Sequence, residues 1–312
     1  MAFRGVPVRD FELVRGLKAS DLVCQMGESG GFTAKKLAVG VDILEEMVSD
    51  KDSVNFFSFP ACIISTGTRG VVAELVKRKL FQVVVTTCGT LDHDLARVYR
   101  RYYHGDFMLD DRLLHRKGVN RLGNVLIPNE CYGLILEEKM QPVLQELYDK
   151  GMRETSGFEL IWEFGKRLKD KQSILYWAAK NKTPVIVPGI LDGAFGSQLY
   201  FFSQQHRDFK VNAFKDEDKI AEIIFSAKKS GALMIGGGIS KHHTIWWNQF
   251  KDGLDRAVYL TSAPEWDGSL SGARLREAVS WGKVKEKAKY TTIEGDATIN
   301  LPLMAAALLD RI

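Results

Sequence analysis

The chain has 312 residues, of which 45% are hydrophobic and 26% charged, and 43 Lys and Arg against 39 Asp and Glu leave a formal net charge of +4. These values are typical of a globular protein and exclude disordered, collagen-like and coiled-coil chains. The near balance of charge gives no support for a nucleic-acid partner. No apolar run reaches about 18 residues, and the N-terminus has no signal-peptide core, so we expect no membrane partner.

The four cysteines are scattered along the chain at Cys24, Cys62, Cys88 and Cys131, without a CxxC pair. Zinc sites usually take their ligands from closely spaced pairs. The run Asp92-His93-Asp94 offers metal-binding side chains, but no second cluster accompanies it, so we expect no metal. We interpret the cysteines as buried thiols of a cytoplasmic protein, because the cytoplasm keeps thiols reduced.

The first part of the chain, residues 1–55, is expected to form an N-terminal helical elaboration. One buried helix face is predicted by apolar residues at helical spacing, which are Leu37, Val41, Leu44 and Met47. No linker, low-complexity tract or internal repeat divides the chain. We therefore expect a single domain over residues 1–312.

Strand and helix patterns alternate through the rest of the sequence. Two apolar runs, residues 61–65 and 81–86, predict buried strands on either side of a helical pattern over 71–80, which makes a βαβ unit with parallel strands. Further along, the predicted elements are a helix over 173–182, strands over 183–188, 233–235 and 256–260, and a helix over 301–309. The predicted fold class is α/β: a Rossmann-like parallel sheet with helices on both faces.

A run of small or polar residues follows each predicted strand, and these runs begin at Ser65, Thr86, Leu191, Gly236 and Thr261. Ligands of open parallel sheets bind beyond the carboxyl ends of the strands. Small residues allow a ligand to approach the backbone, and free N–H groups can bind a phosphate. The runs therefore favour a nucleotide site. The GxGxxG fingerprint is absent, and ordinary tight turns are the alternative.

Other polar runs give weaker signals. Residues 97–104 combine Arg, Tyr and His and would suit stacking on bases, but a helix with a solvated basic face is the preferred interpretation. His242 and His243 point apart on a helix, so we expect structural histidines or one histidine beside a ligand. A Ser-His-Asp triad has no support because no GxSxG motif is present.

Residues 277–283 carry the strongest chemical signal. Glu277 and Trp281 are one helical turn apart, Gly282 is typical of a helix end, and Lys283 follows it. The carboxylate, the indole and the amine would then converge, which suits a cationic amine ligand. A partly desolvated Lys283 would also suit a Schiff-base nucleophile. The alternative is an ordinary surface lysine.

Six segments resemble the deoxyhypusine synthase family, in order, within a match from about residue 31 to the last predicted helix. They are 86–89 (TTCG), 118–129 (GVNRLGNVLIPN), 192–193 (DG), 236–243 (GGGISKHH), 267–274 (DGSLSGAR) and 277–283 (EAVSWGK). The last block is the most specific. The resemblance implies a deoxyhypusine-synthase-like NAD-binding fold and argues against nucleic-acid binding by residues 97–104.

The resemblance also implies a transferase with NAD as its cofactor. In that family NAD takes a hydride from spermidine, the dehydrogenated amine is cleaved, and its aminobutyl part forms an imine with an enzyme lysine. The group then passes to a lysine of translation initiation factor 5A, and the stored hydride reduces the new imine. Family members are homotetramers with sites between paired subunits, so a homotetramer is implied here.

Residue roles follow from the same resemblance. The catalytic residues that it implies are Lys283 and His242. The residues that it implies for the amine are Asp92, His93, His242, Gly268, Ser269, Glu277 and Trp281. The residues that it implies for NAD, together with their neighbours at the strand ends, are Ser65, Thr87, Cys88, Gly89, Asp192, Gly237, Ser262, Ala263, Asp296 and Ala297.

Three positions depart from the family pattern. Where acidic residues are implied around the amine, this chain has His93, Ser197 and Leu270, and losing carboxylates weakens a site for a multiply charged amine. A different donor or acceptor is therefore an alternative, such as agmatine as donor or homospermidine synthesis. A non-catalytic NAD-binding assembly protein is a third. We also hypothesise that His93 shuttles a proton near neutral pH.

Overall fold

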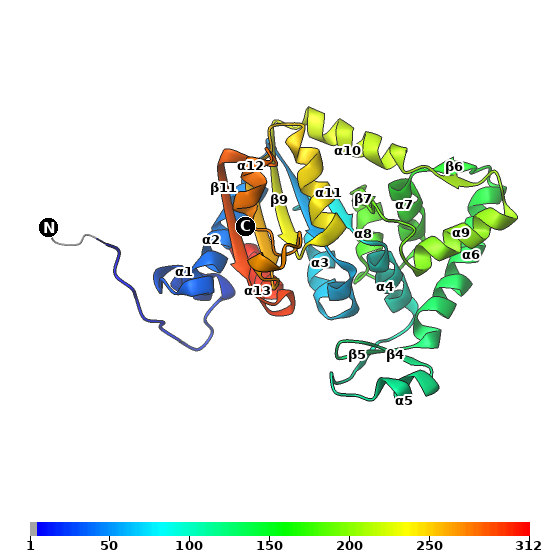
Figure 1. Cartoon of the computed structure of the whole chain (residues 1–312), viewed down its shortest axis with the longest axis horizontal. Helices are drawn as coiled ribbons and strands as arrows, with labels where there is room; N and C mark the ends of the chain where they lie inside the picture. Colours follow the sequence, from blue (N-terminus) through cyan, green and yellow to red (C-terminus); the bar gives the residue numbers. More distant parts are fainter. Residues whose placement is uncertain (1–4) are drawn as a thin grey trace.

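A six-stranded parallel sheet forms the centre of the structure, a computed structural model that describes residues 5–312 (Figure 1). The strand order is β11-β10-β9-β1-β2-β7, and every neighbouring pair is parallel. The strands are β1 (Ser53–Phe59), β2 (Val83–Thr86), β7 (Val185–Ile186), β9 (Lys229–Ile235), β10 (Leu254–Thr261) and β11 (Val284–Glu294). The predicted α/β class with a parallel sheet is confirmed.

The path of the chain creates a switch point between β1 and β9. From β1 the chain adds β2 and β7 on one side, then returns to place β9 on the other side of β1 and continues outward to β10 and β11. The crossovers on the two sides of such a point run in opposite directions, which opens a crevice at the carboxyl ends of the strands. The crevice is expected just beyond Phe59 and Ile235.

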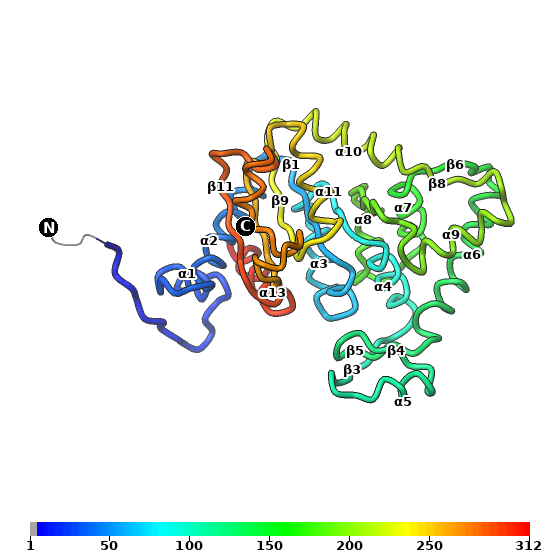
Figure 2. The backbone as a smooth tube through the Cα atoms, in the orientation of Figure 1, coloured from blue at the N-terminus to red at the C-terminus, as the bar shows by residue number. Residues whose placement is uncertain are grey.

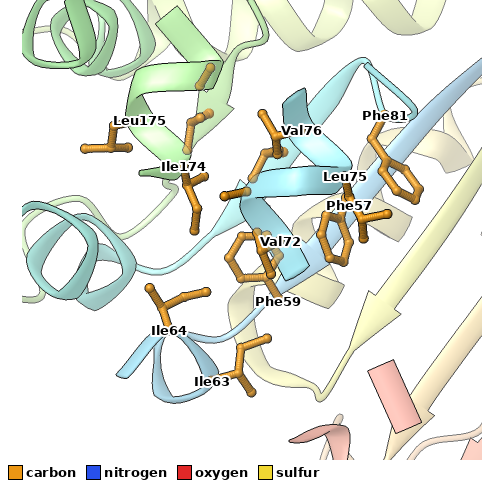
Figure 3. Close-up of a cluster of buried hydrophobic side chains, with 14 of the residues drawn as sticks. Phe57, Phe59, Ile63, Ile64, Val72, Leu75, Val76, Phe81, Ile174 and Leu175 are labelled. Atoms are coloured by element: carbon orange, nitrogen blue, oxygen red, sulfur yellow. The ribbon is translucent and has the colours of Figure 1, made fainter. Parts of the chain in front are cut away.

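Both faces of the sheet are buried. Phe57 and Phe59 of β1 belong to one hydrophobic cluster, whereas Phe56 belongs to the cluster on the other face. Figure 3 shows Phe57 and Phe59 against Val72 of α3 (Thr68–Lys77). Because each face excludes water, every position of the central strands favours an apolar side chain.

Helices cover the two faces of the sheet (Figure 1). On one side lie α2 (Phe32–Ser49), α3 and α13 (Ala297–Arg311), with α1 (Ala19–Glu28) packed on α2 and α13. On the other side lie α11 (Gly238–Gln249) and α12 (Leu275–Ser280). The helix face predicted for the N-terminal part is buried in α2. No helix within residues 5–312 is long and apolar enough to cross a membrane.

The remaining elements extend beyond β7 (Figure 2). The helices of this part are α4 (Cys88–Tyr99), α5 (Asp111–Arg116), α6 (Gly133–Asp149), α7 (Gly157–Arg167), α8 (Ile174–Asn181), α9 (Ala194–Gln205) and α10 (Phe214–Ser226). Its strands are β3 (Tyr103–His104), β4 (Val119–Leu122), β5 (Val125–Pro128), β6 (Glu154–Thr155) and β8 (Lys210–Val211). With α5, the small antiparallel sheet β3-β5-β4 forms a separate projection.

Three buried aspartates fix the helices of this extension. The carboxylate of Asp92 accepts hydrogen bonds from two backbone N–H groups at the start of α9, Asp94 does the same for α8, and Asp216 for α7. A helix N-terminus has unpaired N–H groups and a partial positive charge, so each carboxylate satisfies donors that would otherwise be buried without partners. Asp94 also pairs with the buried Arg69 at 2.6 Å.

The prediction of a strand over residues 61–65 was wrong. Those residues form a 3-10 helix, η1 (Ala61–Ser65), and the strand lies before it as β1. Pro60 separates the two, because proline cannot donate to a strand ladder. The strand therefore begins inside the N-terminal region expected to be helical.

Two further expectations need correction. Residues 97–104 are not one helix, because α4 ends at Tyr99 and β3 includes residues 103 and 104. Cys24 and Cys62 are exposed, and only Cys88 and Cys131 are buried thiols.

In addition, β11 was not predicted, because its alternating lysines resemble a solvated segment. Charged side chains of this kind are common on edge strands.

We predict that Arg69→Met lowers the free energy of unfolding by about 3–5 kcal/mol, because it leaves Asp94 as an uncompensated buried charge. Arg78→Met, which removes the surface pair with Glu74, is the matched control and should cost less than about 1 kcal/mol. Urea unfolding at one protein concentration measures both. If both variants lost the same free energy of unfolding, the Arg69–Asp94 pair would be no more important for stability than a surface ion pair.

Candidate active site

A cavity of about 890 Å³ lies at the carboxyl edge of the sheet, where the switch point predicts a ligand. Seven of the residues expected to bind NAD line it: Ser65, Thr87, Gly237, Ser262, Ala263, Asp296 and Ala297. They come from η1 and from the segments that follow β2, β9, β10 and β11. The structure therefore brings together side chains that are far apart in the sequence.

The turn after β9 lines the cavity and leads directly into α11. A Cβ on Gly237 would lie 2.2 Å from Ser271, so only glycine fits the close approach there. No side chain caps the N-terminus of α11, which begins at the next residue. Uncapped N–H groups at the start of a helix, beside a cavity, favour a phosphate group.

The small sheet supplies one wall of the same cavity. Leu122, Gly123, Asn124 and Val125, around the turn between β4 and β5, all line it. These residues belong to the segment 118–129 that resembles the family. The segment 118–129 therefore contributes to the ligand cavity. The spacing of its residues in the sequence did not predict this contribution.

Three residues expected on the NAD side do not line the cavity. Cys88 is buried, and its thiol donates to the carbonyl of Ile190 at 3.0 Å. Burial raises the pKa of this thiol to about 12, so it stays protonated. Gly89 packs against Ala61 of η1, and Asp192 is exposed in the segment before α9. We assign Cys88 and Gly89 to the support of the cavity wall.

The lysine block adopts the predicted local structure. The helix α12 ends before Trp281, and Gly282 has a φ of +66°, the left-handed conformation that suits a helix end. The Nζ atom of Lys283 lies 5.1 Å from the ring centroid of Trp281 and 5.6 Å from that of Trp246. Burial and the charge of Lys283 lower the pKa of His242.

Glu277 does not pair directly with Lys283. Within residues 5–312 no ion pair within 4 Å joins its carboxylate to a cation. The negative charge of Glu277 acts on Lys241 instead. Burial lowers the pKa of Lys241 to about 7, and Glu277 counteracts part of this lowering. The Nζ atom of Lys241 donates to the carbonyls of Leu270 and Ala273. Lys241 thus anchors the loop that carries Gly268 and Ser269.

Asp92 and His93 lie inside the protein. One oxygen of Asp92 accepts from the Tyr132 hydroxyl at 2.6 Å, and the carboxylate also caps α9, so it is not free to bind an amine directly. The Nδ1 atom of His93 lies 2.9 Å from the Tyr102 hydroxyl. Burial, with a contribution from Arg97, lowers the pKa of His93 to about 4. The lowered pKa favours a neutral ring near neutral pH, and the proton-shuttle hypothesis stays a prediction.

In one chain the two halves of the expected site are apart. Lys283 lies beside the first residue of β10, because its carbonyl accepts from the N–H of Leu254, whereas Thr261 at the other end of β10 lines the cavity. The seven residue-to-residue steps from Leu254 to Thr261 correspond to about 23 Å. None of His242, Trp281 and Lys283 lines the cavity.

Sequence reasoning missed two residues beside the lysine block. Trp246 was not predicted, although it is one helical turn beyond His242 and their rings stack at 5.6 Å. Lys241 was noted only as part of the motif, and nothing in its spacing reveals the carbonyls that it binds across 29 and 32 residues.

The sheet, its helices and the cavity define a Rossmann-like α/β protein with a ligand cavity at the carboxyl edge of the sheet. A model of the deoxyhypusine synthase family matches residues 21–308. Over 303 residues the chain is 58% identical to a probable deoxyhypusine synthase of Picrophilus torridus and 55% identical to one of Thermoplasma acidophilum, with 97% of both chains covered in each case. The chain belongs to the deoxyhypusine synthase family, whose members are transferases.

A solved structure shares the fold. The crystal structure is of a protein from Entamoeba histolytica named "putative deoxyhypusine synthase", and it matches with a TM-score of 0.65. The match covers 97% of both chains at 17% identity. At that identity the likeness supports the architecture of the sheet and its helices.

We predict that the wild-type protein loses stability relative to His93→Asn as the pH falls from about 6.5 to 4. In this range the unfolded histidine binds a proton while the folded one, with its lowered pKa, does not. The difference in the free energy of unfolding between the two proteins should shrink by on the order of 3 kcal/mol. Urea unfolding at several pH values measures it, and a constant difference would contradict the buried neutral ring.

Proposed function

We propose that this protein transfers the aminobutyl group of spermidine to a specific lysine of translation initiation factor 5A, with NAD as cofactor and Lys283 as the imine-forming residue. The observation that carries the proposal is the setting of Lys283. The residue is buried, with 8% of its surface exposed, and its Nζ lies 5.1 Å from the ring centroid of Trp281 and 5.6 Å from that of Trp246. Within residues 5–312 no carboxylate pairs with it.

The cavity fits NAD in size and chemistry. Its volume lies within the range of about 300–1,000 Å³ that is usual for ligand sites. The Gly237 turn and the start of α11 offer N–H groups to a pyrophosphate, and Asp296 offers a carboxylate to ribose hydroxyls. When bound, NAD supplies the acceptor for the amine's hydride and returns it at the end.

The residues of this chain then have distinct tasks. Trp281 packs against the amine and excludes water, and His242 accepts or holds a proton beside Lys283. The amine of Lys283 adds to the C=N carbon of the dehydrogenated donor, and the bond from that carbon to the rest of the donor breaks, so that the remainder leaves as a free diamine. The lysine of the protein substrate then adds to the same carbon, and Lys283 leaves as a free amine. Lys241 holds the loop of Gly268 and Ser269 in place through two carbonyls.

The complete site forms between two copies of the chain. The separation of about 23 Å along β10 supports this, because it keeps Lys283 away from the cavity of its own chain. Two such pairs make the homotetramer that we propose. We place this reaction in the cytoplasm for two reasons. The proposed substrate is a translation factor, and the four cysteines have free thiols, as is usual in a reducing compartment.

A second candidate function differs from the first in its amine donor. The positions where carboxylates are implied hold a buried neutral His93, a Ser197 whose hydroxyl donates to the carbonyl of Gly193, and Leu270. None of the three carries a negative charge that could form an ion pair with a protonated amine. A donor with fewer amine charges, such as agmatine, or a homospermidine-forming reaction is therefore the alternative.

The deciding experiment is the intact mass of factor 5A after incubation with this protein, NAD and spermidine. We expect a gain of one aminobutyl unit on a single lysine. Spermidine without NAD is the control and should give no gain. If the mass stays unchanged with spermidine but rises with agmatine, the donor assignment is wrong and the second candidate replaces it.

We predict that Lys283→Ala lowers aminobutyl transfer by roughly a thousandfold or more, because no other group forms the imine. The variant should still bind NAD and should trap no amine with borohydride. Lys285→Ala, which removes a lysine of β11 paired with Asp255, is the matched control and should keep both activities. Absence of trapping in the wild type would favour a non-catalytic assembly protein.

A further inference from the structure

The positive charge of the chain is concentrated in the projection, residues 100–128, which contains β3, α5, β4 and β5. This segment has six Lys and Arg and three Asp, a net charge of +3, while the whole chain has a net charge of +4. The projection stands away from the body of the molecule (Figure 2). A surplus of one charge on an exposed element favours a partner of the opposite charge.

The three aspartates of the projection have structural tasks. Asp106 accepts a backbone N–H group in the turn before α5, and Asp110 accepts two N–H groups at the start of that helix. Asp111 binds the guanidinium of Arg121 through both of its oxygens, at 2.6 and 2.7 Å. Because a helix of six residues is not stable by itself, these bonds hold α5 on the small sheet.

The cations of α5 have no comparable partner. Arg112 and Arg116 are one helical turn apart, and Lys117 follows at the end of the helix. All three are exposed, and within residues 5–312 no carboxylate lies within 4 Å of their charged groups. Like charges one turn apart destabilise a helix, so this arrangement favours an anionic group outside the chain that neutralises them.

Apolar side chains accompany these cations. Met108 is 90% exposed and Phe107 is 66% exposed, and Leu109 and Leu113 are exposed as well. Met and Arg are enriched in protein interfaces, and several exposed apolar side chains on one small element are typical of an interaction site. The projection therefore offers apolar contact together with positive charge.

These features favour a protein partner over a nucleic acid. Carboxylates lie among the cations and would repel a run of phosphates. A single strand also needs a series of stacking rings. Of the two exposed aromatic side chains in residues 100–128, Tyr103 and Phe107, the second lines the cavity and lies against Gly123. Met and Leu side chains suit a protein surface better than a base.

The projection also has a suitable position for docking. The turn between β4 and β5 lines the cavity through Gly123 and Asn124, and Phe107 lines it from the loop before α5. A protein bound to α5 is therefore held by the same small sheet that forms one wall of the cavity.

We propose that the projection docks the protein substrate through an acidic surface segment of that protein. Arg112 and Arg116 pair with its carboxylates, and Met108 contacts its apolar side chains. The identity of the partner rests on the proposed function, whereas its acidic chemistry rests on the projection alone. Complementary charge of this kind speeds the encounter of two proteins, and salt weakens it.

The first test measures the binding of two fluorescent probes to the full chain. One probe is a short synthetic peptide of Glu with interspersed Leu, and the other has Gln in place of every Glu. We expect the wild type to bind the acidic peptide more tightly than the neutral one. Arg112→Glu/Arg116→Glu should bind the acidic peptide on the order of tenfold more weakly.

Two further variants separate docking from a general effect of charge or folding. Met108→Ser removes a side chain that is 90% exposed, so it should weaken binding of the acidic peptide without disturbing the fold. Arg207→Glu/Lys210→Glu makes the same change of charge at exposed residues outside the projection and should bind as the wild type does.

Kinetics test the docking with factor 5A itself. Arg112→Glu/Arg116→Glu should raise the KM for factor 5A by on the order of tenfold at low salt. Because neither side chain lines the cavity, kcat and the affinity for NAD should stay unchanged. The difference from the wild type should shrink as the salt concentration rises.

Three results would each overturn the docking surface: equal binding of the acidic peptide by the wild type and the Arg112→Glu/Arg116→Glu variant, tighter binding of a single-stranded RNA than of the acidic peptide, and a changed oligomeric state of that variant. If factor 5A gains mass with an unchanged KM, the proposed function stands and this inference fails. If factor 5A gains no mass while peptide binding still depends on Arg112 and Arg116, the proposed function fails and the acidic docking surface stands.

Discussion

The helical half of this molecule depends on buried carboxylates that hold helix N-termini. Asp92 and Asp94 lie two residues apart on α4, and each receives the N–H groups of a different helix. Since the two side chains leave α4 in different directions, one short segment fixes α8 and α9 against it. The run Asp92-His93-Asp94, which resembles a metal-binding motif, therefore connects three helices of the fold.

The parts of the fold that the sequence predicted are those with a clear period. The strands around residues 83–86, 233–235 and 256–260 are apolar on both faces, and the helix over 297–311 is long, so these elements were found. The strand before Pro60 was misplaced because residues 61–65 are equally apolar but lie in a 3-10 turn. Burial alone does not distinguish the two.

The residues of the candidate site likewise fall into those that the sequence predicted and those that it did not. The residues after each strand were found because parallel strands end at one edge, and most of them line the cavity. The roles of Asp92 and Lys241 depend on hydrogen bonds to backbone groups about 30 to 100 residues away, and no local pattern records those contacts. Trp246 was missed because its partner Lys283 is close only in the folded chain.

Under the proposed function, the distance between Lys283 and the cavity at the sheet edge has a genetic consequence. If each complete site takes its lysine from one copy and its cavity from another, the two defects are separable. A chain that lacks Lys283 and a chain with a blocked Gly237 turn are each inactive alone. When the two chains assemble together, one site combines the intact cavity of the first chain with the intact Lys283 of the second. That site is complete, so the two null alleles complement each other.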